Sequence, residues 1–200
     1  MTNVISVSTL SGLYSALASA KGGETIELAG GNYGDLSLIS KAGFPLKFPS
    51  DVTITSADPE NPAVFARADV RGIQNLTFDG ITFDYSFRPG EPIWIRPFSF
   101  SNTEGLTIRN STFDGDVAKG VSAVDDGYGY ASGLSVRGSS DVTLEQNEVS
   151  GFYRGITVVE SQDITVRGNN LYDMRMDGMN FAEVRNVLVE ENWIHDFRAS

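Results

Sequence analysis

The sequence predicts an all-β solenoid with three short strands in each coil and a short helix at its N-terminal end. The main observation is a segment of strand, polar corner and second strand that occurs five times. The first apolar residues of its copies are separated by 30, 36, 22 and 23 residues, so the shorter steps give the basic period and the longer ones contain insertions. A repeat of this length cannot bury its own apolar face, so successive copies must stack. The first apolar residues are Leu76, Leu106, Val142, Ile164 and Val187.

Length and composition fit a single domain that covers residues 1–200. Hydrophobic residues make up 40% of the chain, which is enough for a core, and 21 glycines suit many corners. The absence of cysteine excludes disulfides and thiolate metal sites. The net charge of −11 argues against a nucleic acid partner, because phosphate binding requires a dense basic surface. The same charge repels acidic polysaccharides at long range, so their binding needs a local basic cleft or a bridging cation.

The sequence contains no apolar stretch long enough to cross a membrane, so no membrane insertion is expected. The N-terminus lacks the charged start and long apolar run of a Sec-type signal peptide. An extracellular or virion-surface location would therefore require another export route, earlier processing or release inside a particle.

The N-terminal helix is expected over about residues 8–21. Apolar residues at positions 10, 13, 17 and 20 fall on one helical face. Ser8 or Thr9 is the expected N-cap, and Gly22 and Gly23 end the helix. Such a helix would cover the end of the core and the exposed strand edges.

The coils are expected to begin near residue 24. Ile26 and Leu28 alternate with polar residues, as in a half-buried strand. Further strands are expected over residues 35–39 and 51–55, whereas residues 40–50 and 56–62 contain Pro and Gly and are expected to form loops.

From residue 66 onward, each copy predicts three strands whose apolar residues point inward at alternate positions. The inward pairs of the first strands begin eight residues before the first apolar residue of each copy. These pairs begin at Ala68, Phe98, Leu134, Ile156 and Met179. The third strands centre on Phe83, Phe113, Val149, Leu171 and Ile194.

Three asparagines occupy one corner of successive copies. Asn147, Asn169 and Asn192 each follow the first apolar residue of their copy by five positions. Identical amides at one corner are expected to stack, each bonding the backbone of its own coil and of a neighbouring coil. We interpret this asparagine ladder as structural.

The capping helix, the three strands per coil, the asparagine corner and residues 23–33 (GETIELAGGNY) together resemble the right-handed parallel β-helix of the pectate-lyase-like superfamily. Residues 23–33 are most similar to chondroitinase-B-like and alginate-lyase-like members. That superfamily includes lyases, hydrolases, uronan epimerases and phage tailspikes, so the resemblance defines a fold and not an activity. It implies that substrates lie along the outer face of the first strands, between long loops.

The two insertions fall at the corner before the first strand. They cover roughly residues 85–97 and 115–132, and their aromatic and charged side chains suit sugar rings. The alternative is that these side chains only fold the loops onto the coils. The candidate substrate-binding residues are Trp94, Arg96, Asp125, Asp126, Tyr128 and Tyr130, together with Asn180 on the outer face of a first strand.

No residue is assigned a catalytic role, and the candidates are Arg154, Arg175 and Asp177. Arg154 and Asp177 are 23 residues apart and therefore one coil apart. An arginine here would pair with a uronate carboxylate, as in the lyases that the sequence resembles, or Arg154 and Asp177 form only an exposed ion pair. None of the four lysines falls on the outer face of the first strands, and the Asp-Pro-His-Glu motif of alginate epimerases is absent.

No cofactor is predicted, although the resemblance leaves calcium open. Asp84, Asp114, Asp173 and Asp196 recur near one corner, but no Asp-x-Asp-x-Asp-Gly loop exists. His195 is the single histidine and is expected to be a solvent-facing structural residue.

Three hypotheses for function follow. The first is a polysaccharide-recognising module of an exported or virion-associated protein, of the spike or fibre type. The second is a polysaccharide lyase or uronan epimerase acting on an acidic glycan, and the third is a structural spacer or decoration protein. Because the last residues complete a coil without a cap, the chain or a protein assembly is expected to continue at that end.

Overall fold

The computed structural model describes residues 3–198 and shows a stack of coils that runs from the helix at the N-terminal end to the last strands. Each coil has three faces, which we name the first, second and third face in chain order. Parallel strands of successive coils pair along each face, at the spacing of about 4.8 Å that is usual in sheets. The predicted all-β parallel β-helix with a short helix is therefore confirmed.

The N-terminal end of the stack is covered by α1 (Leu10–Ser19), two residues shorter at each end than predicted. Thr9 is the N-cap, since its hydroxyl accepts a hydrogen bond of 3.0 Å from the backbone N–H of Gly12. Leu13 and Leu17 bury the apolar side of the helix against the core. Before the helix lies β1 (Asn3–Val7), a strand that the sequence did not predict and that pairs with the first coil.

The first face has six strands. They are β3 (Gly31–Ile39), β5 (Ala63–Arg71), β8 (Phe98–Ser101), β11 (Ser132–Arg137), β14 (Arg154–Val159) and β17 (Asp177–Ala182). The predicted alignment is confirmed, because Ala68, Phe98, Leu134, Ile156 and Met179 pair in succession.

The second face is a sheet of eight strands that begins with β1. The others are β2 (Glu24–Leu28), β4 (Lys47–Ser56), β6 (Gln74–Asp79), β9 (Glu104–Arg109), β12 (Ser140–Glu145), β15 (Gln162–Arg167) and β18 (Arg185–Glu190). Strand β4 starts at Lys47, earlier than expected, because Lys47 already pairs with Gln74 before a register shift.

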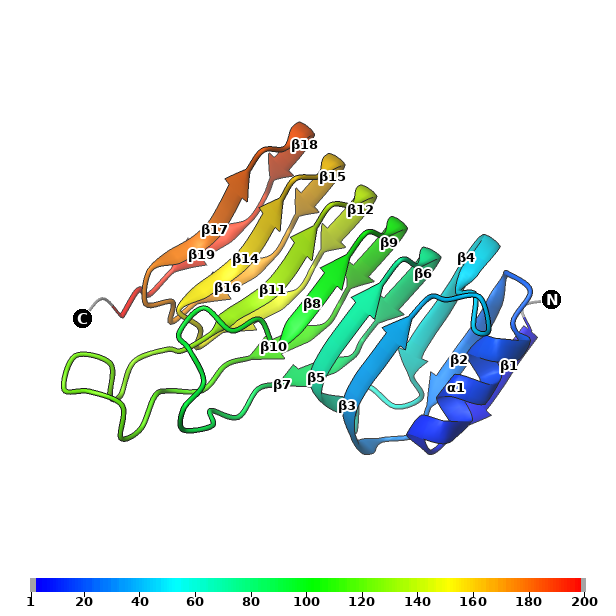
Figure 1. Cartoon of the computed structure of the whole chain (residues 1–200), viewed down its shortest axis with the longest axis horizontal. Coiled ribbons are helices and arrows are strands. Elements are labelled where there is room, and N and C mark those ends of the chain that lie inside the picture. Colours follow the sequence, from blue (N-terminus) through cyan, green and yellow to red (C-terminus); the bar gives the residue numbers. More distant parts are fainter. Residues whose placement is uncertain (1–2, 199–200) are drawn as a thin grey trace.

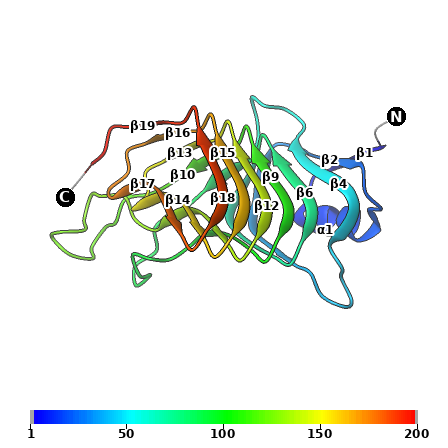
Figure 2. The ribbon, with the colours of Figure 1, turned by 90° about the horizontal axis from the view of Figure 1, so that it is seen from above.

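The third face is narrow and has five strands of three residues each. They are β7 (Thr82–Asp84), β10 (Thr112–Asp114), β13 (Glu148–Ser150), β16 (Asn170–Tyr172) and β19 (Trp193–His195), four of which are labelled along the upper edge of Figure 2. The first and third faces belong to one hydrogen-bonded sheet, because the long strand β5 pairs with β7 through Phe65 and with β8 through Ala68.

Aromatic rings fill the middle of the core. Phe83 is fully buried and stacks on Phe113, with ring centroids 4.5 Å apart and an interplanar angle of 12°. Four further phenylalanines surround it at 5.4 to 6.2 Å, namely Phe65, Phe78, Phe98 and Phe100. This packing fixes the coils from which the loops emerge.

Side-chain amides join the coils at the corner between the second and third faces. The Asn169 Oδ1 accepts hydrogen bonds from the backbone N–H and the Nδ2 of Asn147, at 2.9 and 3.0 Å, and Asn192 does the same for Asn169. Ser111 occupies the equivalent place one coil earlier, and its backbone N–H donates to Asn147 Oδ1 at 3.1 Å.

A second column of this kind, which the sequence analysis missed, lies between the first and second faces. The backbone N–H groups of Thr103 and Ser139 donate to the hydroxyls of Ser139 and Ser161, each at 3.1 Å. The signal was present in the sequence, because each of these residues precedes the first apolar residue of its copy by three positions.

Candidate functional site

Both insertions emerge from the corner between the third and first faces, as predicted, and project from the lower left of Figure 1. We call residues 85–97 the first loop and residues 115–131 the second loop. The Tyr130 hydroxyl of the second loop donates to the backbone carbonyl of Glu91 at 2.8 Å. The Tyr130 ring meets the Phe87 ring edge to face at 5.0 Å, and the Phe87 N–H donates to Asp116 Oδ2 at 3.0 Å. The two loops therefore form one ridge.

Glu91 anchors the first loop to the coils. Its carboxylate accepts from Arg67 Nη2 at 2.7 Å and from the Tyr85 hydroxyl at 2.9 Å. The Arg67 guanidinium also lies 5.4 Å from the Tyr85 ring centroid. Burial, followed by the hydrogen bond to Glu91, raises the pKa of Tyr85, which therefore stays a neutral donor. Sequence reasoning missed this cluster, because Arg67 lies on a strand far from the loop in the chain.

A groove of about 610 Å³ lies between the first loop and the outer face of β3, β5 and β8. This volume is in the range of ligand-binding clefts. Trp94 forms one wall, and its side chain is 69% exposed. Arg67, Arg71 and Arg96 also line the groove, together with the carboxylates of Asp35 and Asp69.

The three arginines of the groove differ in their partners. Arg67 pairs with Glu91, and Arg71 makes a two-point contact of 2.6 and 2.7 Å with Asp69. For Arg96 the described residues provide no hydrogen bond or ion pair, and it is exposed. Arg96 is therefore the cation of the groove whose donors are available to an anionic ligand.

The second loop runs across the following coils instead of lining the groove. Gly115 and Gly129 lie so close to the next coil that a Cβ would be 2.4 Å from the Gly151 carbonyl oxygen and 2.6 Å from that of Phe152, respectively. Only glycine permits this approach, so the loop lies directly on the corner of the next coil.

Arg175 fastens the far end of the second loop. Its Nη1 donates to Asp125 Oδ1 at 2.8 Å and its Nη2 to the Val124 carbonyl at 3.2 Å. The guanidinium is 5.4 Å from the ring of Tyr128 and 5.5 Å from that of Tyr153. A hydrogen bond from Ser122 and then one from Arg175 lower the pKa of Asp125. Arg175, Asp125 and Tyr128, which are candidates for catalysis or binding, thus contact one another at the end of the loop.

Two further predicted binding residues are used within the ridge. Tyr130 is 3% exposed, and it packs the two loops together. Asp126 accepts from the backbone N–H groups of Val121 and Ser122 at 2.8 and 3.3 Å, and the hydrogen bond from Val121 is the main reason why its pKa is lowered. Tyr130 thus packs the loops, whereas Asp126 is exposed and its binding role stays a prediction.

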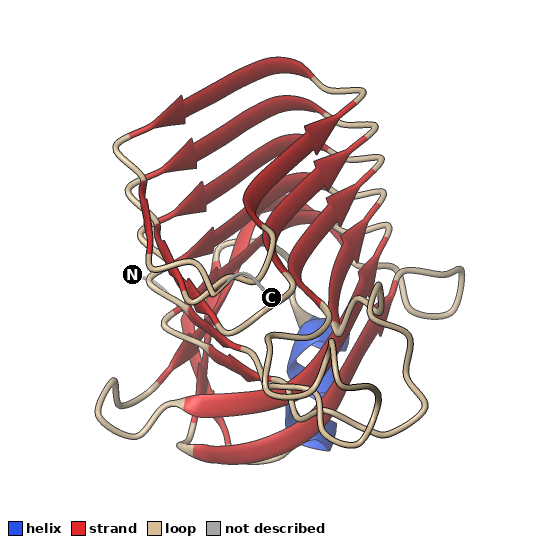
Figure 3. Ribbon diagram, turned by 90° about the vertical axis from the view of Figure 1, so that its left-hand side faces the viewer, coloured by secondary structure: helices blue, strands red, loops and turns tan. Residues whose placement is uncertain are grey.

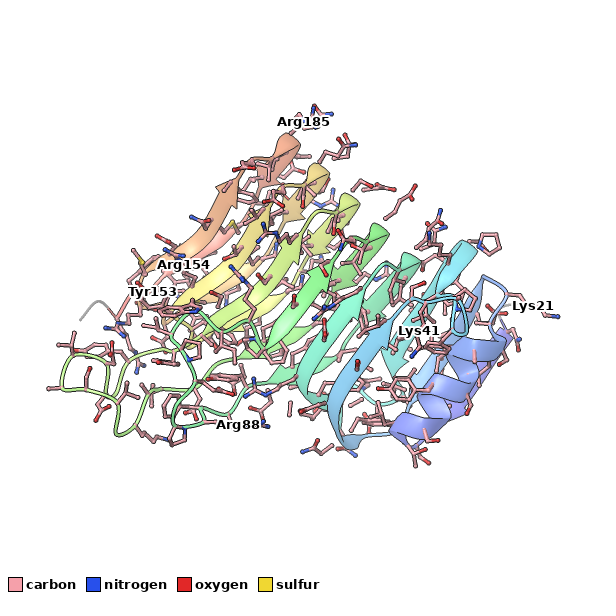
Figure 4. The ribbon with its side chains drawn as sticks, in the orientation of Figure 1. Lys21, Lys41, Arg88, Tyr153, Arg154 and Arg185 are labelled. Atoms are coloured by element: carbon pink, nitrogen blue, oxygen red, sulfur yellow. The ribbon has the colours of Figure 1, made fainter. Side chains whose placement is uncertain are left out.

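Arg154 and Asp177 form the ion pair that their spacing predicted, with 2.9 Å between Nε and Oδ2. Arg154 also contacts the Met176 sulfur at 3.6 Å and lies over the ring of Tyr153 (Figure 4). Asn180 is half-buried on the outer face of β17, where it pairs in register with Thr157. The structure therefore brings Trp94 and Arg96 together near the N-terminal coils, and the other candidates near the C-terminal coils.

The recurring aspartates do not converge on a metal site. Within residues 3–198, no group of three His, Asp or Glu side chains is arranged to hold a metal ion. Burial, followed by the charges of Asp84, Asp116 and Glu148, raises the pKa of Asp114. In the described part of the chain, the single helix α1 spans ten residues, which is too short to cross a membrane.

Residues 98–200 match the family model described as the right-handed β-helix region, and the chain belongs to this family. No curated protein matches the chain at a significant level.

Among solved structures, the PL6 family alginate lyase AlyGC superposes with a TM-score of 0.50 and 12% identity. The match covers 96% of this chain but 38% of the lyase, so the chain spans well under half of that enzyme. An alginate lyase from Paenibacillus sp. str. FPU-7 gives a TM-score of 0.37 at 16% identity, with 95% of this chain and 75% of the lyase covered. At these identities the comparisons establish the fold alone.

Proposed function

We propose that the chain recognises an acidic polysaccharide in the groove between the first loop and the first face. The observation that carries this proposal is that an exposed Trp94 lines the same groove as Arg96, the arginine there for which the described residues provide no ion pair. The C–H face of a sugar ring packs on an indole ring, and a guanidinium binds a carboxylate through two parallel hydrogen bonds. The guanidinium of Arg96 supplies a local positive charge against the repulsion that the rest of the chain exerts on such a ligand.

Binding is better supported than catalysis. A lyase needs a base beside the uronate and a group that neutralises its carboxylate. In the described structure no lysine lines the groove, and Arg154 pairs with Asp177 while Arg175 holds the second loop. A titration with oligouronates distinguishes this proposal from the lyase or epimerase hypothesis and from the spacer hypothesis.

The proposal also includes the location of the protein. A chain that recognises a polysaccharide would act where these polymers occur, outside the cell or on a virion surface, as an adhesion, spike or fibre component. Polysaccharide is accordingly the proposed partner.

The test is a titration of the protein with oligouronates by isothermal calorimetry at low and high salt. Arg96→Ala should weaken binding about tenfold or more, because a charge-assisted contact is worth roughly 1.5–3 kcal/mol. Trp94→Ala should also weaken binding, because it removes the ring on which the sugar packs. Arg185→Ala is the matched control, since Arg185 is an exposed arginine that lies on β18, away from the groove (Figure 4). High salt should weaken the wild-type interaction.

Three results would change this conclusion. Equal loss in Arg185→Ala and Arg96→Ala would show that net charge, not the groove, governs binding. A rise in the ultraviolet absorbance of unsaturated uronates would establish the lyase hypothesis. The absence of both binding and turnover, with co-purification of a large assembly, would favour the spacer hypothesis.

A further inference from the structure

The groove beside the first loop holds equal numbers of cationic and anionic side chains, once the partner of Arg67 is counted with its lining residues. The charged side chains are Arg67, Arg71, Arg96, Asp35, Asp69 and Glu91. Their formal charges cancel, so the groove as a whole is neither basic nor acidic. The charge that a ligand meets therefore depends on which of these side chains are already paired.

Ion pairs take up all but two of these charges. Arg67 Nη2 is 2.7 Å from Glu91 Oε1, and Arg71 binds both carboxylate oxygens of Asp69 at 2.6 and 2.7 Å. The two remaining side chains, of Asp35 and Arg96, are exposed and have no hydrogen bond or ion pair among the described residues. The groove thus presents one free anion and one free cation.

The free anion and the free cation lie at opposite ends of the groove. Asp35 on β3 pairs in register with Arg67 on β5. The next residue, Ala68, donates its backbone N–H to the carbonyl of Pro97, which follows Arg96. Asp35 and Arg96 are therefore two coils apart, a backbone separation of roughly 10 Å. This separation is comparable to the length of a disaccharide.

The surface between the two ends suits a neutral sugar. Ser37, Asp69 and Ser99 form one row of register partners across the three coils, and the Asp69 carboxylate is already held by Arg71. The exposed Trp94 lines the same groove. Hydroxyls along the floor can exchange hydrogen bonds with a sugar, and the indole offers a surface for its C–H face.

We infer that Asp35 determines the specificity of the groove, which takes an acidic polysaccharide whose carboxylates are separated by a neutral sugar. The inference rests on the proposed function and deepens it. A uronate carboxylate binds the guanidinium of Arg96, so the neighbouring sugar lies towards Asp35. A second carboxylate there is repelled by Asp35, whereas the hydroxyls of a neutral sugar donate hydrogen bonds to it.

Calorimetry with two oligosaccharides of equal length tests the role of Asp35. One is a tetrasaccharide of consecutive uronates, and the other alternates glucuronate with N-acetylglucosamine. Asp35→Asn preserves the size of the side chain and removes its charge. It should strengthen binding of the consecutive uronates about fivefold, because two like charges about 4 Å apart in water repel by that factor. It should not strengthen binding of the alternating oligomer.

Asp141→Asn is the matched control. Asp141 is also an exposed aspartate without a side-chain partner among the described residues, but it lies on β12 of the second face. Its φ of 54° is one that asparagine adopts as readily as aspartate. Both substitutions change the net charge equally, so a difference between them reports the position of the charge. Urea unfolding curves of the two variants check that the fold is preserved.

The inference is overturned if Asp35→Asn strengthens binding of both oligomers equally, or strengthens that of the consecutive uronates no more than Asp141→Asn does. If Arg96→Ala still weakens binding of the same oligomers, the proposed function stands and only the role of Asp35 is refuted. Loss of the Arg96→Ala effect, or no binding by the wild type, refutes the proposed function itself and the inference with it.

Discussion

Removing the Glu91 carboxylate should detach the first loop, and with it Trp94, from the coils. Glu91 is the point where Arg67, Tyr85 and Tyr130 meet, through its two carboxylate oxygens and its backbone carbonyl. Glu91→Ala removes the first two of these contacts and leaves the third in place. The substitution thus tests whether the ridge depends on this carboxylate.

The loss in free energy of unfolding caused by Glu91→Ala can be estimated from the groups that lose a partner. Arg67 and Glu91 are each 17% exposed, so the pair is largely buried. Removing one member of a buried pair costs about 3–5 kcal/mol, and we take the lower value because water still reaches both groups. The buried Tyr85 hydroxyl loses its acceptor, which adds about 1 kcal/mol. The sum is roughly 4 kcal/mol, and most of it comes from an unpaired guanidinium.

A double-mutant cycle separates these contributions. If the unpaired charge dominates, Arg67→Met combined with Glu91→Ala should be more stable than Glu91→Ala alone by about 2 kcal/mol. Urea denaturation followed by circular dichroism measures the free energies of unfolding. Limited proteolysis should also cut Glu91→Ala within the first loop faster than the wild type.

Glu160→Ala is the matched control for this cycle. Glu160 pairs with Arg137 at 2.6 Å, but these side chains are 43% and 56% exposed. An exposed pair of this kind contributes about 0–1 kcal/mol. If Glu91→Ala lowers the free energy of unfolding no more than Glu160→Ala does, the Glu91 pair contributes no more than an exposed pair, and the anchoring role is refuted.

Two further outcomes can be checked. Asn169→Ala should destabilise the fold by about 3 kcal/mol in urea denaturation, because the buried Asn147 N–H and Leu144 carbonyl lose their partners. Asn192→Ala should destabilise it less, because Asn192 is only half-buried. Equal losses in the two variants would contradict an effect of burial. The lowered pKa values of Asp125 and Asp126 predict that the second loop is fully held above the usual aspartate range, near pH 4, and loosens as pH falls through the lowered values. Hydrogen exchange of residues 116–130 between neutral and acid pH measures this loosening, and unchanged protection in acid would show that the two carboxylates do not hold the loop.

The coils could be predicted from the sequence because their apolar residues alternate and recur with a fixed period. Register followed from the same pattern, since a shift by one residue would turn Phe98 or Leu134 outward. Strand β1 was missed because Asn3–Val7 lies before the repeats and resembles none of them. The start of β4 was missed because Pro49 and the register shift interrupt its alternation.

The site was predicted only in part, and the reason is physical. The insertions had to lie at one corner, so the position of Trp94 and Arg96 beside the first face followed from spacing. The roles of Tyr130 and Arg175 could not be predicted from spacing, because a tyrosine in a loop or an arginine beside it is equally suited to bind a ligand or to pack the loop. Only the partner decides, and Glu91 and Asp125 lie 39 and 50 residues away from these two side chains.

The separation of charge between faces is a consequence of the coil. Inward positions are constrained by the core, but each outward position belongs to one face only, so a face can acquire its own charge without disturbing packing. The groove of the first face gathers three arginines and two aspartates, while the five short strands of the third face carry carboxylates and no lysine or arginine. At physiological ionic strength the screening length is about 8 Å, so faces separated by the core act as independent electrostatic surfaces. A net charge of −11 is therefore a sum over faces that differ in local charge, and a proposal for a ligand has to be argued from one face.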